Sequence, residues 1–191
     1  MDERAMARGQ KKAEEEGRTI LWVDESGFYL LPSVVRTYAP RGKTPILKVP
    51  LTRDHLSAIS AVTPGGDLYL GVQDRAYKSE DVVRFLDHLL LHVSGSLTII
   101  WDGSPIHRSK VIKDYLASGA ARRIHLERLP GYAPDLNPDE GIWRYLKRVE
   151  LRNLCCSNLT ELRRELRLAT GRLRYRRHII RSCIKEAGYH V

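Results

Sequence analysis

Cysteine is scarce in this chain of 191 residues, where it occurs only as Cys155, Cys156 and Cys183. Adjacent cysteines rarely pair with each other and there is no Cys-x-x-Cys spacing, so the sequence argues against a disulfide framework and against a zinc site. We therefore expect a reduced, cytoplasmic setting. The thiols are better interpreted as small apolar packing groups than as reactive centres.

Long hydrophobic runs are also missing. No apolar stretch reaches the roughly 18 residues that a membrane-spanning helix needs. Residues 1–18 carry five basic and five acidic side chains without the apolar segment of a secretory signal. These absences predict a protein with no membrane role. Hydrophobic residues still make up 42% of the chain, which is enough for a packed core.

A net positive charge is missing from most of the chain. Residues 1–140 carry 19 basic and 19 acidic side chains, whereas residues 141–191 carry 13 basic and 4 acidic ones. The whole formal net charge of +9 therefore lies at the C-terminal end, which excludes a uniformly basic chromatin-type protein. Such a basic block is either a solvated helix face or a surface that binds a polyanion, most often nucleic acid.

The order of hydrophobic patterns predicts an α/β fold with a mixed sheet. Short apolar runs rich in β-branched and aromatic residues favour strands, and apolar residues at helical spacing favour amphipathic helices. We expect strands over 19–26, 34–39, 56–63, 67–73, 97–104 and about 123–129, and helices over 79–93, about 107–118, 138–152 and 158–187. Hairpins come first and alternating helices and strands follow, so antiparallel pairs should precede parallel crossovers.

Two of the apolar strands end in an acid, Asp24 and Asp102, and each acid follows a tryptophan within two residues. Ligand sites in open α/β sheets lie beyond the carboxyl ends of the strands, so the two carboxylates would share a site if their strands are neighbours. Glu140 opens a helix after a proline-rich loop and would add a third. Such a cluster needs cations, and Mg²⁺ or Mn²⁺ prefers oxygen ligands. Two ions ~4 Å apart would support an in-line phosphoryl displacement.

The same acids also have a structural interpretation. The two strand-end acids could be turn formers, and Asn137 and Glu140 fit the N-cap and N3 positions of a capping box. Asp139 and Glu25 are neighbouring alternatives, although Glu25 would face the other side of the strand from Asp24. Spacing alone leaves these interpretations open.

Three motifs resemble those of DDE transposases of the mariner superfamily, particularly the branch found in bacterial insertion sequences. They are WVDES at 22–26, WDGSPIHRS at 101–109 and LPGYAPDLNPDEGIW at 129–143. The third matches the family block Tyr-x-Pro-x-Leu-Asn-Pro-x-Glu-x-x-Trp. The matching positions are Asp24, then Asp102, Gly103 and His107, then Tyr132, Pro134, Leu136, Asn137, Pro138, Glu140 and Trp143.

The resemblance covers about residues 18–150 and implies an RNase H-like fold with Mg²⁺-dependent DNA strand cleavage and joining at element ends. It implies that Asp24, Asp102 and Glu140 are catalytic and hold the metal ions. His107 and Asn137 are candidate auxiliary residues. His107 would contact phosphate or orient a carboxylate, unless it is only a polar residue at a helix start.

Gly103 stands where Asn is commoner in the family, so the side-chain contact beside the second acid is expected to differ in this chain. Trp22, Trp101 and Trp143 are interpreted as core residues rather than as platforms for stacking bases.

The C-terminal helices are rich in arginine, and we expect this surface to hold DNA phosphates that flank the acidic site. The arginine placement gives no base-specific readout. The expected DNA contacts are Arg144, Lys147, Arg148, Arg152, Arg163, Arg164, Arg167, Arg174, Arg176 and Arg177, with Arg172 and Arg181 on the same helices.

We divide the chain into a charged linker or helix (1–17), an RNase H-like catalytic core (18–152) and a basic helical extension of the same domain (153–191). The expected partners are double-stranded DNA, as element ends and as target, and a second copy of the chain. A separately encoded helix-turn-helix polypeptide is also expected, since 17 residues before the first strand are too few for such a domain. The protein would be cytoplasmic, and nucleoid-associated when it is bound to DNA.

Two alternatives to a transposase catalytic domain stay open. One is an RNase H-fold nuclease without joining activity. The other is a catalytically inactive, DNA-binding remnant of a transposase.

Overall fold

The computed structural model describes residues 10–13, 15–49, 52–131 and 133–190. In this part of the chain, five strands form one sheet in the order β3-β2-β1-β4-β5. They are β1 (Thr19–Tyr29), β2 (His55–Val62), β3 (Leu68–Gln73), β4 (Leu97–Trp101) and β5 (Ile124–Arg128). The first three pair antiparallel, and β4 and β5 run parallel to β1, which confirms the predicted mixed sheet.

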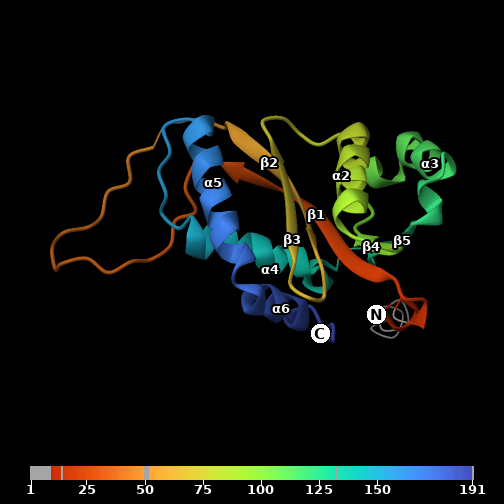
Figure 1. Cartoon of the computed structure of the whole chain (residues 1–191). Helices are drawn as coiled ribbons and strands as arrows, with labels where there is room; N and C mark the ends of the chain where they lie inside the picture. Colours follow the sequence, from red (N-terminus) through yellow and green to blue (C-terminus); the bar gives the residue numbers. More distant parts are fainter. Residues whose placement is uncertain (1–9, 14, 50–51, 132, 191) are drawn as a thin grey trace.

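Helices cover both faces of the sheet (Figure 1). One face packs against α4 (Pro138–Tyr145), α5 (Leu159–Arg174) and α6 (Arg177–Glu186), and the other against α2 (Ser79–His92) and α3 (Lys110–Ala117). Short turns complete the chain: 3-10 turns η1 (Pro105–Arg108), η2 (Ala120–Arg122) and η3 (Pro134–Leu136), and a π-helical turn η4 (Leu146–Glu150).

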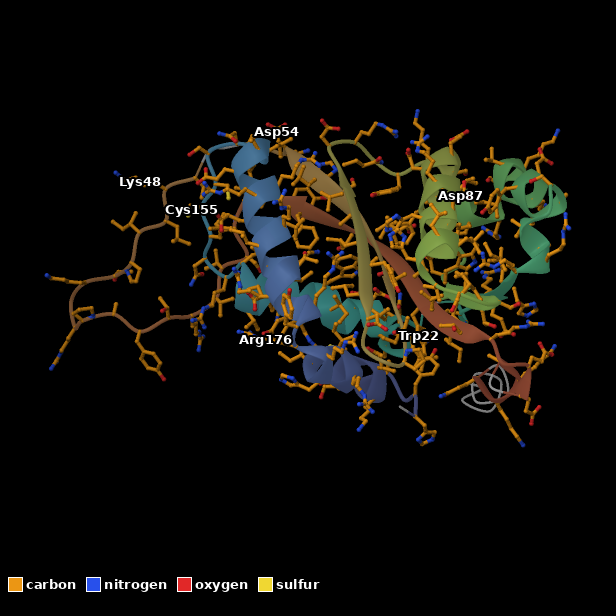
Figure 2. All side chains as sticks on the ribbon, viewed as in Figure 1. Trp22, Lys48, Asp54, Asp87, Cys155 and Arg176 are labelled. Carbon is orange, nitrogen blue, oxygen red and sulfur yellow. The ribbon has the colours of Figure 1, made fainter. Side chains whose placement is uncertain are left out.

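Alternation along β1 divides the core into two layers. Trp22 and Phe28 face α4, α5 and α6, whereas Leu21 and Val23 face α2 and α3. Side chains fill the space on both sides of the sheet, with Trp22 inside the first layer (Figure 2). Trp101 and Trp143 are also buried, as predicted.

The strand predicted over 34–39 is absent, and residues 31–49 form a long loop that extends away from the sheet (Figure 1). Pro32 and Pro40 bound this segment and lack the N–H that a strand pair needs. Its backbone bonds to a side chain instead: Val35 N–H donates to Asn153 Oδ1 over 2.8 Å and Val35 C=O accepts from Asn153 Nδ2 over 3.0 Å. The apolar residues of the segment therefore find no sheet partner, and Tyr38 is fully exposed.

Two predicted helix boundaries also differ. The helix expected over 107–118 is divided into η1 and α3, because Ser109 is extended and its hydroxyl caps α3 by accepting from Ile112 N–H. The helix expected over 138–152 is α-helical only to Tyr145 and continues as the π-helical turn, in which Leu151 N–H bonds to Leu146 C=O. The helices expected over 158–187 are confirmed as α5 and α6.

The charged segment predicted over 1–17 lies partly outside the described residues, and within it residues 10–13 and 15 are helical. None of the helices in the described ranges is long and apolar enough to cross a membrane.

Candidate active site

The sheet register brings the two strand-end acids together. Trp22 of β1 lies opposite Ile100 of β4, and two further residues along this parallel register reach Asp24 and Asp102. Glu140 lies in the first turn of α4, which packs against β1. All three acids line one cavity of about 370 Å³ at the carboxyl ends of the strands. Three segments far apart in the sequence thus supply its carboxylates.

Asp24 is the most deeply buried of the three, with 9% of its surface exposed. Burial raises the pKa of its carboxyl group to about 7, and the charges of Glu25, Glu140 and Asp102 add to this rise. A hydrogen bond works in the other direction, since Trp143 Nε1 donates to Asp24 Oδ2 over 2.9 Å. The carboxylate is therefore held in place in surroundings that disfavour its negative charge.

Asp102 is half exposed and is bound to its own loop and to His107. Its Oδ1 accepts from Ser104 N–H over 2.9 Å and lies 2.8 Å from His107 Nδ1. The other ring nitrogen of His107, Nε2, lies 2.9 Å from Glu25 Oε1, and the ring stacks flat on Trp101 at 4.3 Å between centroids. His107 thus joins the end of β4 to the far face of β1.

Burial of the imidazole lowers the pKa of His107, but the hydrogen bond and charge of Glu25 and the charge of Asp102 outweigh it, so the pKa is raised. The sequence interpretation placed Glu25 on the face opposite Asp24. The structure agrees, since Asp24 contacts α4 and Glu25 contacts His107. It also shows a contact for Glu25 that the sequence interpretation missed.

Asp139, the neighbouring alternative to Glu140, is completely buried. Its Oδ1 accepts a hydrogen bond from Ser60 Oγ on β2, and its Oδ2 has no partner among the described residues. Burial and the negative charge of Asp24 raise the pKa of Asp139 well above its usual value. Helical spacing in the sequence could have indicated this burial, because Asp139 lies one turn before the buried Ile142 on α4.

Asn137 caps α4, but the reciprocal half of the expected capping box is absent from the described structure. Its Oδ1 accepts from Asp139 N–H over 3.2 Å. Glu140 is exposed, and its carboxylate has no hydrogen-bond or ion-pair partner in the described ranges. Since Glu140 lines the acidic cavity, the cap orients the helix and leaves this carboxylate available.

The donor set of the cavity suits a hard divalent cation. Asp24, Asp102 and Glu140 offer only carboxylate oxygens, which Mg²⁺ and Mn²⁺ prefer. Burial, and to a smaller extent the neighbouring carboxylates, raise the pKa of Asp24, and a bound cation would offset both effects. As placed, no three His, Cys, Asp or Glu side chains of the described residues form a group that could hold a metal ion. Asp24 and Asp102 are instead bonded to Trp143 and His107, so metal binding would need side-chain rotation.

A larger groove of about 840 Å³ continues from the acidic cavity along α4 and shares Asn137 and Glu140 with it. Three of the predicted DNA-contacting residues line it, namely Arg144, Lys147 and Arg148. Lys147 is half buried, and its Nζ donates to Ser26 Oγ over 2.8 Å. The groove therefore places basic side chains beside the acidic cavity, although Asp135, Glu140 and Glu186 also line it.

Other predicted DNA-contacting arginines have partners within the chain. Arg163 and Arg174 donate to the carbonyls of Val72 and Leu68, which lie on the edge strand β3. Such contacts cover a sheet edge that would otherwise expose unpaired carbonyls. Ion pairs join Arg164 to Glu165, Arg172 and Arg176 to Glu150, and Arg177 to Asp67. In the groove itself, Arg144 is paired with Glu186.

Arg148, Arg152, Arg167 and Arg181 are exposed and have no hydrogen-bond or ion-pair partner in the described ranges. DNA contact stays a prediction for every basic residue of this surface.

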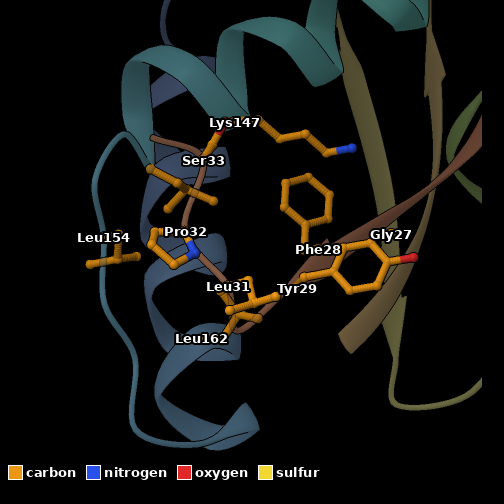
Figure 3. A pocket seen from close by; sticks show the side chains of 10 residues that line it. Gly27, Phe28, Tyr29, Leu31, Pro32, Ser33, Lys147, Leu154 and Leu162 are labelled. Atoms are coloured by element: carbon orange, nitrogen blue, oxygen red, sulfur yellow. The ribbon is translucent and has the colours of Figure 1, made fainter. Parts of the chain in front are cut away.

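A separate cavity of about 190 Å³ lies between the end of β1 and α5 (Figure 3). Its walls are mainly apolar, with Phe28, Leu31, Pro32 and Leu162 among the lining residues and no carboxylate. Lys147 closes one side, and its Nζ lies 5.2 Å from the centre of the Phe28 ring. The acidic cavity, and not this one, carries the candidate chemistry.

Residues 19–163 match the family model described as DDE superfamily endonuclease. A search of curated proteins found no match. Tyr132, which the third motif includes, lies outside the described residues.

Among solved structures, the mariner Mos1 paired end complex with Mg is similar, with a TM-score of 0.64, 16% identity, and coverage of 98% of this chain and 61% of that chain. The catalytic domain of Mos1 mariner transposase gives a TM-score of 0.56 and 12% identity, with coverage of 100% of this chain and 97% of that one. The chain spans less than two thirds of the Mos1 chains in the paired-end complexes. At these identities the likeness establishes the fold, which is RNase H-like as predicted.

Proposed function

Because the chain belongs to the DDE superfamily of endonucleases, we propose that it is a mariner-like transposase catalytic domain that cuts and joins DNA at insertion-sequence ends. The observation that carries this proposal is the meeting of Asp24, Asp102 and Glu140 in one cavity, from β1, β4 and α4. The likeness to Mos1 structures supports the fold on which these residues stand.

In this proposal Asp24, Asp102 and Glu140 are the catalytic residues, and they would hold two Mg²⁺ or Mn²⁺ ions. Those ions would supply charge neutralisation at the phosphate and activation of water or a 3′ hydroxyl. Mos1 complexes solved with Mg and with Mn are consistent with this choice of metals. In the metal-free protein Trp143 holds Asp24 and His107 holds Asp102, and both carboxylates would rotate from these contacts to reach the ions.

Asn137 has an indirect role. By capping α4 it fixes the helix end from which Glu140 projects, so it is a positioning residue.

The substrate would be double-stranded DNA, as element end and as target. Its backbone would follow the groove beside α4, where Arg144, Lys147 and Arg148 can contact phosphates that flank the acidic cavity. A second copy of the chain and a separately encoded helix-turn-helix polypeptide are proposed partners, the latter to supply recognition of the ends. The proposed location is the bacterial cytoplasm, at the nucleoid when DNA is bound.

The test is nicking of supercoiled plasmid DNA and joining of an oligonucleotide end, each with and without Mg²⁺ or Mn²⁺. We expect metal-dependent products from the wild type and none from Asp102→Asn. Asp114→Asn is the matched control, because Asp114 is an exposed acid of α3 that does not line the acidic cavity. Undiminished activity in Asp102→Asn would refute the assignment.

The alternatives give different products. A nuclease without joining activity would nick the plasmid but transfer no strand to it. A catalytically inactive remnant would bind DNA and neither nick nor join with either metal.

A further inference from the structure

One cation lies among the acids and was not among the residues that the sequence singled out. Arg128 is the last residue of β5 and pairs in register with Trp101, the residue before Asp102. It lines the acidic cavity together with Asp24, Asp102 and Glu140. The cavity is therefore not purely acidic, since a guanidinium lies at its border.

Gly103 provides the space that this guanidinium occupies. A Cβ built on Gly103 would lie 2.4 Å from Nε and Nη2 of Arg128 and 2.6 Å from its Cζ. Gly103 is not among the glycines with positive φ, so its backbone conformation does not require glycine. Any larger side chain at this position would meet the guanidinium and displace it.

The guanidinium of Arg128 has no hydrogen-bond or ion-pair partner in the described part of the chain, and the side chain is exposed. Two of the cavity's carboxylates are bonded elsewhere, Asp24 to Trp143 and Asp102 to His107 and its own loop, and no ion pair joins the third, Glu140, to Arg128 in the described part of the chain. Arg144, by contrast, is paired with Glu186. Arg128 is thus a cation at the acidic cavity that the protein itself leaves unpaired.

We propose that Arg128 binds a phosphate of the DNA strand that enters the acidic cavity, and that Gly103 is the residue that makes room for it. This inference rests on the proposed function, because DNA is the substrate there. A guanidinium offers two parallel N–H donors to the non-bridging oxygens of a phosphate, which fixes both position and orientation. Arg128 would therefore hold the strand on the β5 side, opposite the groove along α4.

The test measures binding of a fluorescein-labelled duplex oligonucleotide to the full chain by anisotropy, at graded salt concentrations and in EDTA. We expect Arg128→Gln to weaken binding roughly tenfold and to make the slope of log affinity against log salt shallower by about 0.9. The matched control is Arg122→Gln, which removes the same charge from an exposed, unpaired arginine before the other end of β5. It should change neither quantity by as much.

Gly103→Ala tests the space directly, because it moves the guanidinium without removing its charge. It should weaken binding in the wild-type background and cause no further loss when combined with Arg128→Gln. The proposal is overturned if Arg128→Gln binds like the wild type, if Arg122→Gln loses as much, or if the two losses simply add. A lower melting temperature of Arg128→Gln would also overturn it, since the residue would then be structural.

Because binding in EDTA needs no cleavage, the two proposals fail separately. An inactive wild type with the Arg128 effect intact would refute only the cleavage proposal. An active wild type whose Arg128→Gln variant binds normally would refute only the role of Arg128.

Discussion

Replacing Asp24 by asparagine should stabilise the metal-free protein at neutral and alkaline pH. Asp24 is buried, and burial together with nearby negative charge raises its pKa from 3.8 to about 7. Asparagine has nearly the same shape and can still accept the hydrogen bond from Trp143 Nε1. The variant therefore removes the cost of ionisation and keeps the local packing.

The sign and size follow from proton linkage. Between pH 3.8 and about 7 the folded protein holds a proton on Asp24 that the unfolded chain releases, so this residue's contribution to stability falls as pH rises and is constant above that interval. Each pH unit is worth about 1.4 kcal/mol, so the full interval amounts to about 4 kcal/mol. Asp24→Asn should match the wild type near pH 3.8 and exceed it by about this amount at pH 8.

Urea denaturation followed by tryptophan fluorescence, at pH values from 4 to 8 in EDTA, measures this difference. The difference between variant and wild type also includes the part of the raised pKa of Asp139 that comes from the charge of Asp24, and this part acts in the same direction. Equal stability of the two proteins at pH 8, or the same pH dependence in both, would refute the interpretation of Asp24 as a destabilising buried carboxylate.

Two further predictions concern the surroundings of the site. Ser60→Ala removes the hydrogen bond to buried Asp139 and should lower the free energy of unfolding, measured by urea denaturation, by about 1–3 kcal/mol. Thr98→Val is the control, because it removes a buried hydroxyl that has no partner among the described residues and should not lower this free energy. Arg148→Gln should weaken duplex DNA binding and make its salt dependence shallower by about 0.9, while Arg174→Gln, which loses a contact to edge strand β3, should mainly lower the melting temperature. If Arg148→Gln and Arg174→Gln weakened DNA binding equally, a partner within the chain would not distinguish a structural arginine from a DNA-binding one.

Hydrophobic patterning predicted the central elements because their environments are uniform along their length. β4 is buried at every position and apolar except for Thr98, and α2 and α5 each have one apolar face. The strand predictions for β1 and β4 put Asp24 and Asp102 at the carboxyl ends of their strands. Their adjacency needed the register, which depends on pairing between distant segments and cannot be derived from either strand alone.

Residues 34–39 show where local pattern fails. Val34, Val35 and Tyr38 resemble a strand, but whether a strand forms depends on a partner, and the nearest one for Val35 is the side chain of Asn153. Counting charges does not identify the DNA-binding arginines either, because a count does not show which of them have partners within the chain. Arg163 and Arg174 look the same as Arg148 in the sequence, yet they cover the edge of β3.

Acids in adjacent positions were equally hard to separate. Asp139 and Glu140 both follow Pro138, and only the rotation of α4 decides which of them is buried against Ser60 and which lines the cavity. The sequence does not single out Arg128, because it is one of 19 basic side chains in residues 1–140, where an equal number of acidic side chains balances them.

The most direct test of the central claim is an anomalous difference map from a crystal of this protein soaked in Mn²⁺. The account predicts manganese peaks at the acidic cavity, bound by Asp24, Asp102 and Glu140, and their loss in a soaked Asp102→Asn crystal. Well-ordered carboxylates with no peak between them, or manganese bound only elsewhere, would contradict it.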